Sequence, residues 1–84
     1  MPELELTPRF RRQWSRLPPE AQVAVARALA KLGQGTGRRK ALARFAGLFE
    51  LRVTDDLRLT WSWGVAGRVV VRSVGRHDVT LKRP

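Results

Sequence analysis

From Leu48 to Arg76 the chain alternates apolar with polar side chains, and two turn sequences interrupt this alternation. The first turn is Thr54-Asp55-Asp56 and the second is Gly64-Val65-Ala66-Gly67. A period of two is typical of strands that bury one face, and short polar or glycine-containing breaks are typical of hairpins. The pattern therefore predicts three consecutive antiparallel strands, so any fold proposed for this chain must contain an antiparallel sheet.

The N-terminal half predicts one short strand and two helices. Glu3-Leu4-Glu5-Leu6 alternates in the manner of a half-buried strand. We expect Thr7 to cap a first helix that begins at Pro8 and runs to about Leu17, because proline is tolerated in the first helical turn. Pro18-Pro19 ends this helix and begins a second one. The predicted buried stripe of the second helix is Val25, Ala26, Leu29 and Leu32.

These elements predict an α+β fold in a single domain, residues 1–84. An N-terminal strand and a helical hairpin precede a three-stranded antiparallel meander, and the strands form one sheet with the helices packed on one face. A chain of 84 residues is too short to divide its core between two domains. Without cysteine and with a single histidine, we expect no disulfide, no metal site and no cofactor.

The chain also lacks the features of an exported or membrane protein. No apolar run approaches the roughly 20 residues that span a bilayer. The N-terminal Met1-Pro2-Glu3-Leu4-Glu5 lacks the basic and then apolar order of a secretory signal. We therefore expect a cytoplasmic protein that makes no membrane contact.

The formal net charge of +10 implies a polyanionic partner, since a field of this sign attracts nucleic acid and repels further copies of the chain. Most of the basic residues are arginine, whose planar fork suits phosphate and base stacking. An acidic protein is the alternative partner, and a GC-rich genome would also favour arginine codons. Self-repulsion predicts a monomer when the chain is free.

The segment from Gly33 to Lys40 combines three glycines with three consecutive cations, Arg38, Arg39 and Lys40. Such a segment is expected to be a loop, because glycine is conformationally permissive. It is either a flap that contacts a flexible polyanion or a plain solvated linker.

Alternation sorts the strand residues onto two faces. One face is apolar and is expected to pack on the helices: Phe49, Leu51, Val53, Leu57, Leu59, Trp61 and Trp63. The opposite face, called the outer face below, is cationic with one embedded carboxylate: Glu50, Arg52, Arg58, Thr60 and Ser62, joined by Arg68 and Arg72 if Val69 and Val71 face the core. These arginines either bind phosphate or merely keep an open sheet face in solution. If the register were opposite, Trp61 and Trp63 would be available to stack on bases.

Three segments carry a resemblance to a known family: Ala46-Gly47-Leu48-Phe49-Glu50-Leu51-Arg52-Val53, Asp56-Leu57-Arg58-Leu59-Thr60-Trp61 and Ser73-Val74-Gly75-Arg76-His77-Asp78. In this order and at nearly this spacing, they resemble the RelE/ParE superfamily of bacterial toxins from toxin–antitoxin systems, and the similarity covers essentially the whole chain. The resemblance implies the RelE-like toxin fold and a cognate acidic antitoxin. For RelE-like members it also implies metal-independent cleavage of mRNA on the 70S ribosome, which inhibits translation.

The resemblance also implies roles for particular residues. Arg58 matches an arginine of the third family strand that stabilises charge on the reacting phosphate, and His77 matches a C-terminal arginine or histidine. Arg52 lies on the face where relatives carry a lysine, whereas Glu50 stands where a further lysine is expected. The tyrosine found near the C-terminus of many active members is missing, because the chain contains no tyrosine.

Cleavage of RNA without a metal requires two proton transfers and stabilisation of the phosphorane. We expect His77 to act as general acid or base, Arg58 and Arg52 to clamp the phosphate, and Arg76 to make a secondary contact. Glu50 is either the complementary base or the ion-pair partner of Arg52 or Arg58. Arg72, Arg38, Arg39 and Lys40 are further candidate RNA contacts.

Two other functions remain open from the sequence. One is inhibition of DNA gyrase in the manner of ParE, which needs a binding surface and no proton carriers. The other is an inactive, purely binding member of the superfamily. The missing tyrosine and the reversed charge at Glu50 favour these alternatives, and His77 beside Arg76 favours the ribonuclease.

Overall fold

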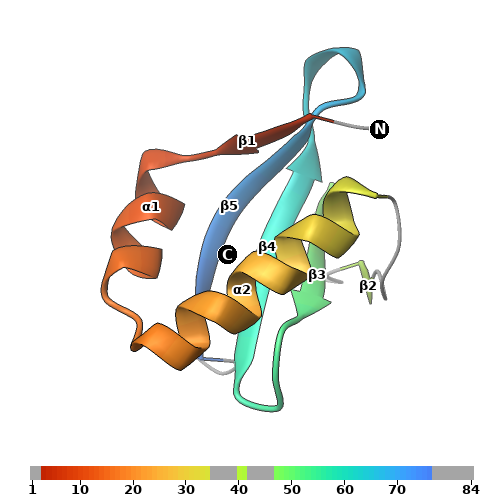
Figure 1. Ribbon diagram of the computed structural model, residues 1–84. Coiled ribbons are helices and arrows are strands. Elements are labelled where there is room, and N and C mark those ends of the chain that lie inside the picture. The colour runs from red at the N-terminus through yellow and green to blue at the C-terminus, as the bar shows by residue number, and fades with distance from the viewer. Residues whose placement is uncertain (1–2, 35–39, 42–46, 77–84) are drawn as a thin grey trace.

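The computed structural model describes residues 3–34, the backbone of 40–41, and residues 47–76. Figure 1 shows the elements in chain order. They are β1 (Leu4–Leu6), α1 (Pro8–Ser15), α2 (Pro19–Gly33), β2 (Lys40–Ala41), β3 (Leu48–Arg52), β4 (Leu57–Trp63), the short 3₁₀ turn η1 (Val65–Gly67) and β5 (Val69–Arg76).

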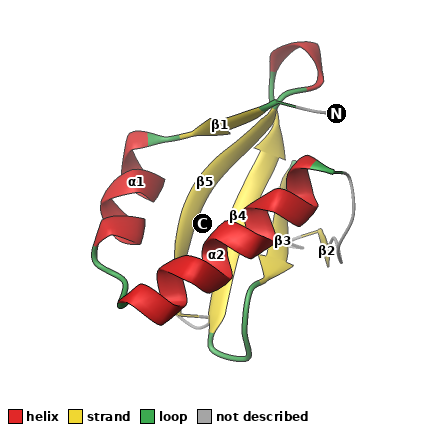
Figure 2. Cartoon of the chain, viewed as in Figure 1, coloured by secondary structure: helices red, strands yellow, loops and turns green. Residues whose placement is uncertain are grey.

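The strands form one mixed sheet in the order β1-β5-β4-β3-β2 (Figure 2). The meander β3-β4-β5 is antiparallel, as predicted, and β1 joins its far edge parallel to β5. The predicted α+β architecture is therefore confirmed. Strand β2 was not predicted: Lys40, expected in a loop, begins this strand and pairs with Glu50 of β3.

The helical hairpin begins where the sequence predicts it. The Thr7 hydroxyl accepts the Phe10 amide N–H at 3.1 Å and donates to the Arg72 carbonyl at 3.0 Å, so one side chain both caps α1 and joins it to β5. Helix α1 ends at Ser15 rather than near Leu17. The Gln22 side chain donates to the Trp14 carbonyl at 3.0 Å, which ties α2 to the last turn of α1.

The core lies between the two helices and the face of the sheet that carries Leu51 and Leu59. In Figure 1, α2 crosses this face diagonally, and α1 lies beside β1 and β5. The predicted stripe on α2 needs one correction: Ala26 is exposed, and Ala28 is buried in its place. The buried positions Val25, Ala28 and Leu32 follow spacings of three and four residues, which keeps them on one helical face.

Strand β5 contains an irregularity that strict alternation misses. Thr60 pairs with Ser73, but the next residue, Trp61, pairs with Val71. Arg72 is therefore the extra residue of a β-bulge. Beyond the bulge the alternation is offset by one residue, so both Val71 and Val74 are buried in the core.

Both predicted hairpin turns are present. Between β3 and β4, the Thr54 hydroxyl accepts the amide protons of Asp56 and Leu57. Between β4 and β5, Ala66 and Gly67 adopt positive φ angles of 58° and 77°, the left-handed region that reverses the chain in tight turns. In the described part of the chain, no helix has both the length and the apolar character needed to cross a membrane.

Candidate nucleic-acid interface

The outer face carries a row of three aligned residues near the β3-β4 hairpin. Arg52 of β3 pairs with Arg58 of β4, and Arg58 pairs with Gly75 of β5. Since the Val53 amide donates to the Leu57 carbonyl, Arg52 and Arg58 form the adjacent non-hydrogen-bonded pair, in which side chains lie closer together. Gly75 has no side chain, so no side chain of β5 projects beside Arg58 in this row.

The hairpin turn holds both guanidinium groups. Arg52 donates through Nη2 to the Asp55 carboxylate and forms an ion pair with it. Arg58 donates through Nη1 to the carbonyl oxygens of Thr54 at 2.6 Å, Asp55 at 3.1 Å and Leu57 at 3.1 Å. The turn therefore fixes where the two positive charges lie.

The pairing of Arg52 with Arg58 lowers the stability of the fold, but it holds two positive charges together before any ligand binds. Like charges placed directly opposite each other on neighbouring strands are destabilising. The Arg52–Asp55 pair is well exposed, with 56% and 85% of the two side chains accessible, so it offsets little of that cost. A phosphate placed between Arg52 and Arg58 would remove the repulsion and accept hydrogen bonds from both guanidinium groups.

The next row along the outer face is polar and buried. Glu50, Thr60 and Ser73 are aligned across β3, β4 and β5, with exposures of 7%, 0% and 1%. The Thr60 and Ser73 hydroxyls are 2.5 Å apart and hydrogen-bonded. The centre of the outer face is therefore not the open, solvated surface that we expected. Within the described chain, the carboxylate partner of Arg52 is Asp55 and not Glu50, which corrects the predicted ion pair.

The other candidate phosphate-binding residues of β5 do not lie together on one surface. Arg72 is exposed at the bulge, and its carbonyl accepts the Thr7 hydroxyl. Arg76 is exposed at the end of β5 and pairs with Leu57, so the register assigns its side chain to the face opposite Arg58 and Gly75. Arg68 is engaged by acidic neighbours, because it forms ion pairs with Glu3 at 3.2 Å and Glu5 at 3.7 Å.

Several predicted site residues lie outside the described residues. His77 follows directly after the last residue of β5, and Arg38 and Arg39 precede β2. Lys40 is placed by its backbone alone. Their roles stay predictions.

The tryptophans lie on the helix side of the sheet. Trp61 is fully buried, stacks on Phe49 with a centroid distance of 4.7 Å and meets Trp63 edge to face at 5.1 Å. The alternative in which Trp61 stacks on bases is therefore wrong, because its ring belongs to the core. Trp63 is half exposed at the margin of the same face.

Sequence reasoning missed three residues of this surface: Asp55, Gly75 and Ser73. Asp55 follows Arg52 by three residues across a turn, a spacing that suits an ion pair. Gly75 and Ser73 lie on the outer face only because of the bulge at Arg72, and no local sequence pattern predicts that bulge. Among the described residues, no three His, Cys, Asp or Glu side chains gather closely enough to hold a metal ion.

A mixed sheet with a helical hairpin on one face is the fold of the RelE-like toxins. No protein-family model matches the chain, and a comparison with curated proteins finds no match. Solved structures do match. The toxin–antitoxin complex RelBE2 from Mycobacterium tuberculosis contains a chain that is 25% identical, with a TM-score of 0.73 over 92% of this chain and 100% of that one.

Two further structures agree on the fold at lower identity. The isolated RelE toxin of E. coli has a TM-score of 0.74 at 16% identity and covers 99% of this chain and 98% of its own. The DinJ-YafQ toxin–antitoxin complex of E. coli has a TM-score of 0.73 at 10% identity, with 93% and 94% covered. The predicted resemblance is confirmed, and the chain has the RelE-like toxin fold.

Proposed function

We propose that this chain is the toxin of a toxin–antitoxin system and acts as a metal-independent mRNA endoribonuclease on the ribosome, thereby inhibiting translation. The likeness to RelE-type toxins over nearly the full length supports the toxin assignment. The Arg52–Arg58 pair carries the nuclease part of the proposal. It presents two hydrogen-bonding cations side by side on the sheet face opposite the helices.

Cleavage proceeds by attack of the neighbouring 2′-oxygen of the RNA. This hydroxyl loses a proton, its oxygen bonds to phosphorus, the bond from phosphorus to the 5′-oxygen breaks, and the 5′-oxygen takes up a proton. The products are a 2′,3′-cyclic phosphate and a 5′-hydroxyl end. Arg52 and Arg58 stabilise the charge that builds on the phosphorane.

His77 is assigned one of the two proton transfers, because an imidazole titrates near neutral pH. It follows directly on Arg76, whose strand partner is Leu57, the residue before Arg58. Glu50 receives a structural role in the buried row with Thr60. The other transfer therefore falls to a group of the ribosome or to the RNA itself.

The test is cleavage of ribosome-bound mRNA by the purified protein, with and without a chelator. We expect the wild type to cleave equally in both conditions. Arg58→Ala and His77→Ala should each slow cleavage by about 100-fold or more. Arg16→Ala removes the same charge from the exposed end of α1 and should change little. Because Arg58 also supports the hairpin, thermal unfolding must confirm that each variant is folded. Cleavage at one common rate by all four proteins would refute the assignment.

A second candidate is inhibition of DNA gyrase without catalysis. It is favoured by the turn contacts of Arg52 and Arg58, which engage both guanidinium groups in the free protein. Gyrase supercoiling and in vitro translation, measured in parallel, separate the two. Loss of supercoiling with intact translation would identify the gyrase inhibitor, and neither effect would identify an inactive binding member.

The proposal includes a partner and a place in the cell. A toxin that cleaves mRNA must be neutralised in its host, and a net charge of +10 suits an acidic antitoxin that folds on binding. We place this pair in the cytoplasm, where the ribosomes are. Free of its antitoxin, the chain is proposed to be a monomer.

A further inference from the structure

Strand β5 changes its neighbour along its length. Residues 69–71 pair with β1, and within the described chain β1 pairs with no residue of β5 beyond Val71. Helix α1 contacts β5 and lies beside the part of the strand that β1 leaves uncovered (Figure 1). Among the described elements, α1 is therefore the neighbour of β5 on the side away from β4, at the end where β5 reaches the arginine pair.

The backbone N–H of Val74 points toward this side of β5. Arg52 and Arg58 form a non-hydrogen-bonded pair, so the backbone groups of Arg58 point to its other neighbour, Gly75. Successive residues of a strand direct their backbone groups to opposite sides, so the N–H of Val74 points away from β4. Val74 is buried, and a buried amide without an acceptor destabilises a fold.

Gln13 of α1 supplies the acceptor. Its Oε1 accepts the Val74 N–H at 2.9 Å. The oxygen end of the Gln13 amide must face this donor, because the NH₂ end can only donate. The Thr7 hydroxyl acts similarly two residues earlier on β5, where it donates to the Arg72 carbonyl. Side chains of α1 and its cap therefore replace β1 as hydrogen-bonding partners of β5.

The hydrogen bond from Val74 to Gln13 lies next to the candidate site. Val74 precedes Gly75, the residue that pairs with Arg58. Glycine weakens a strand because it offers no side chain to pack, so a restraint on Val74 limits the motion of β5 at this point. Arg52 and Arg58 are held by the turn between β3 and β4, and their positions do not depend on Gln13.

We propose that Gln13 is a positioning residue of the candidate site and acts through the backbone of β5. It holds Gly75 beside Arg58 and fixes the strand end from which the chain continues to His77. Such a residue affects turnover and not affinity, because it controls how accurately the reacting groups are aligned. The effect on cleavage rests on the proposed function, whereas the restraint on β5 rests on the hydrogen bond alone.

The first measurement is the rate at which the Val74 amide exchanges with solvent, followed by NMR in the free protein. Gln13→Met keeps the length of the side chain and removes the acceptor, so it should raise this rate about 10-fold or more. Gln22→Met is the matched control, because the Gln22 side chain donates to the Trp14 carbonyl at 3.0 Å, between the two helices. The control should leave the rate at Val74 within about 2-fold of the wild type.

The second measurement is cleavage of ribosome-bound mRNA, with kcat and KM determined separately. Gln13→Met should lower kcat about 10-fold and change KM less than about 2-fold, because the arginine pair still binds phosphate. Gln13→Glu restores an acceptor for the Val74 N–H and should return kcat to within about 3-fold of the wild type. Gln22→Met should lower kcat less than about 2-fold. Thermal unfolding confirms that each variant is folded.

Four results would overturn the inference. They are unchanged exchange at Val74 in Gln13→Met, unchanged kcat in the same variant, equal losses of kcat in Gln13→Met and Gln22→Met, and a Gln13→Glu variant as slow as Gln13→Met. The exchange measurement contains neither RNA nor ribosome. A wild type that fails to cleave mRNA would therefore refute the proposed function, and the exchange rate at Val74 would still decide whether Gln13 holds β5.

Discussion

At the scale of single residues, the arginine pair shows what alternation along a strand can and cannot specify. Alternation places Arg52 and Arg58 on the same face, and the register places them directly opposite each other. Alternation does not specify which acceptor each guanidinium group will bind, because an arginine side chain is long enough to reach residues outside its own row. Arg52 turns to Asp55 in the hairpin, while Glu50 is buried in the next row with Thr60.

The first prediction concerns Asp55. Asp55→Asn should raise affinity for a single-stranded RNA oligonucleotide several-fold, because it releases Arg52 from its ion pair. It should change the free energy of unfolding by less than about 1 kcal/mol, since the pair is exposed. Asp56→Asn removes the same charge from the same turn without touching the Arg52 contact. Filter binding and urea unfolding measure the two effects, and an equal gain in affinity from both variants would contradict a specific role for Asp55.

At the scale of elements, β5 is the strand in which the burial predicted from alternation differs from the burial in the structure. Strict alternation from Val71 would place Ser73 in the core and Val74 outside. The bulge absorbs Arg72, and as a result Val74 is buried while Ser73 pairs with Thr60. The Thr7 hydroxyl bonds the carbonyl of the bulged residue, so the helix cap and the bulge support each other.

The second prediction follows from this geometry. Deletion of Arg72 should be tolerated, at a cost below about 2 kcal/mol, because removing the extra residue leaves Val71 and Val74 on their present face. Deletion of Val70 shortens the same strand in its regular part and must turn one core valine outward. It should cost about 4 kcal/mol or more. Urea unfolding of the two deletion variants measures the difference, and similar costs would contradict the assigned bulge.

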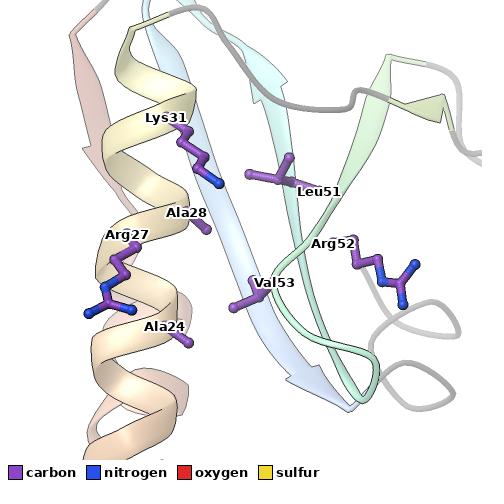
Figure 3. A pocket seen from close by; sticks show the side chains of 7 residues that line it. All are labelled: Ala24, Arg27, Ala28, Lys31, Leu51, Arg52 and Val53. Carbon is purple, nitrogen blue, oxygen red and sulfur yellow. The ribbon is translucent and has the colours of Figure 1, made fainter.

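At the scale of the whole molecule, the excess positive charge is divided between two surfaces. The arginine pair lies on the outer face, and Arg27 and Lys31 line a groove between α2 and β3 on the helix side (Figure 3). Arg68, by contrast, is neutralised by Glu3 and Glu5 at the β1 edge. Net charge alone accounts for attraction to polyanions in general, whereas this division separates the arginine pair from the other positive charges.

The third prediction uses salt to count phosphate contacts. Affinity for single-stranded RNA should fall linearly with the logarithm of salt concentration, with a slope of about −0.7 for each phosphate contact. Arg52→Ala should reduce the slope by about 0.7, and Arg16→Ala should leave it unchanged. Fluorescence titrations at several salt concentrations measure the slope. A smaller slope in both variants would mean that the charge acts as a diffuse field and not through the arginine pair.

The sequence by itself predicted most of the fold. Proline and threonine positions predicted where the two helices begin, the two turn sequences delimited the meander, and alternation predicted the faces of β3 and β4. These features are local, because each depends on residues within a few positions of one another. The two-residue strand β2 has no such local pattern. Nor does any local pattern predict that Ala28 is buried and Ala26 is exposed, because this depends on how α2 is rotated against the sheet.

For the candidate site, the sequence determined which residue types face the same way: Arg52 with Arg58 on one side, and Trp61 with Leu59 on the other. Only the tertiary structure decided their neighbours. It brought Gly75 beside Arg58, buried Glu50, joined Arg52 to Asp55 and left a groove along Ala24 and Ala28. The physical reason is that facing follows from backbone geometry along one strand, whereas neighbours depend on register, bulges and side-chain reach between segments far apart in the chain.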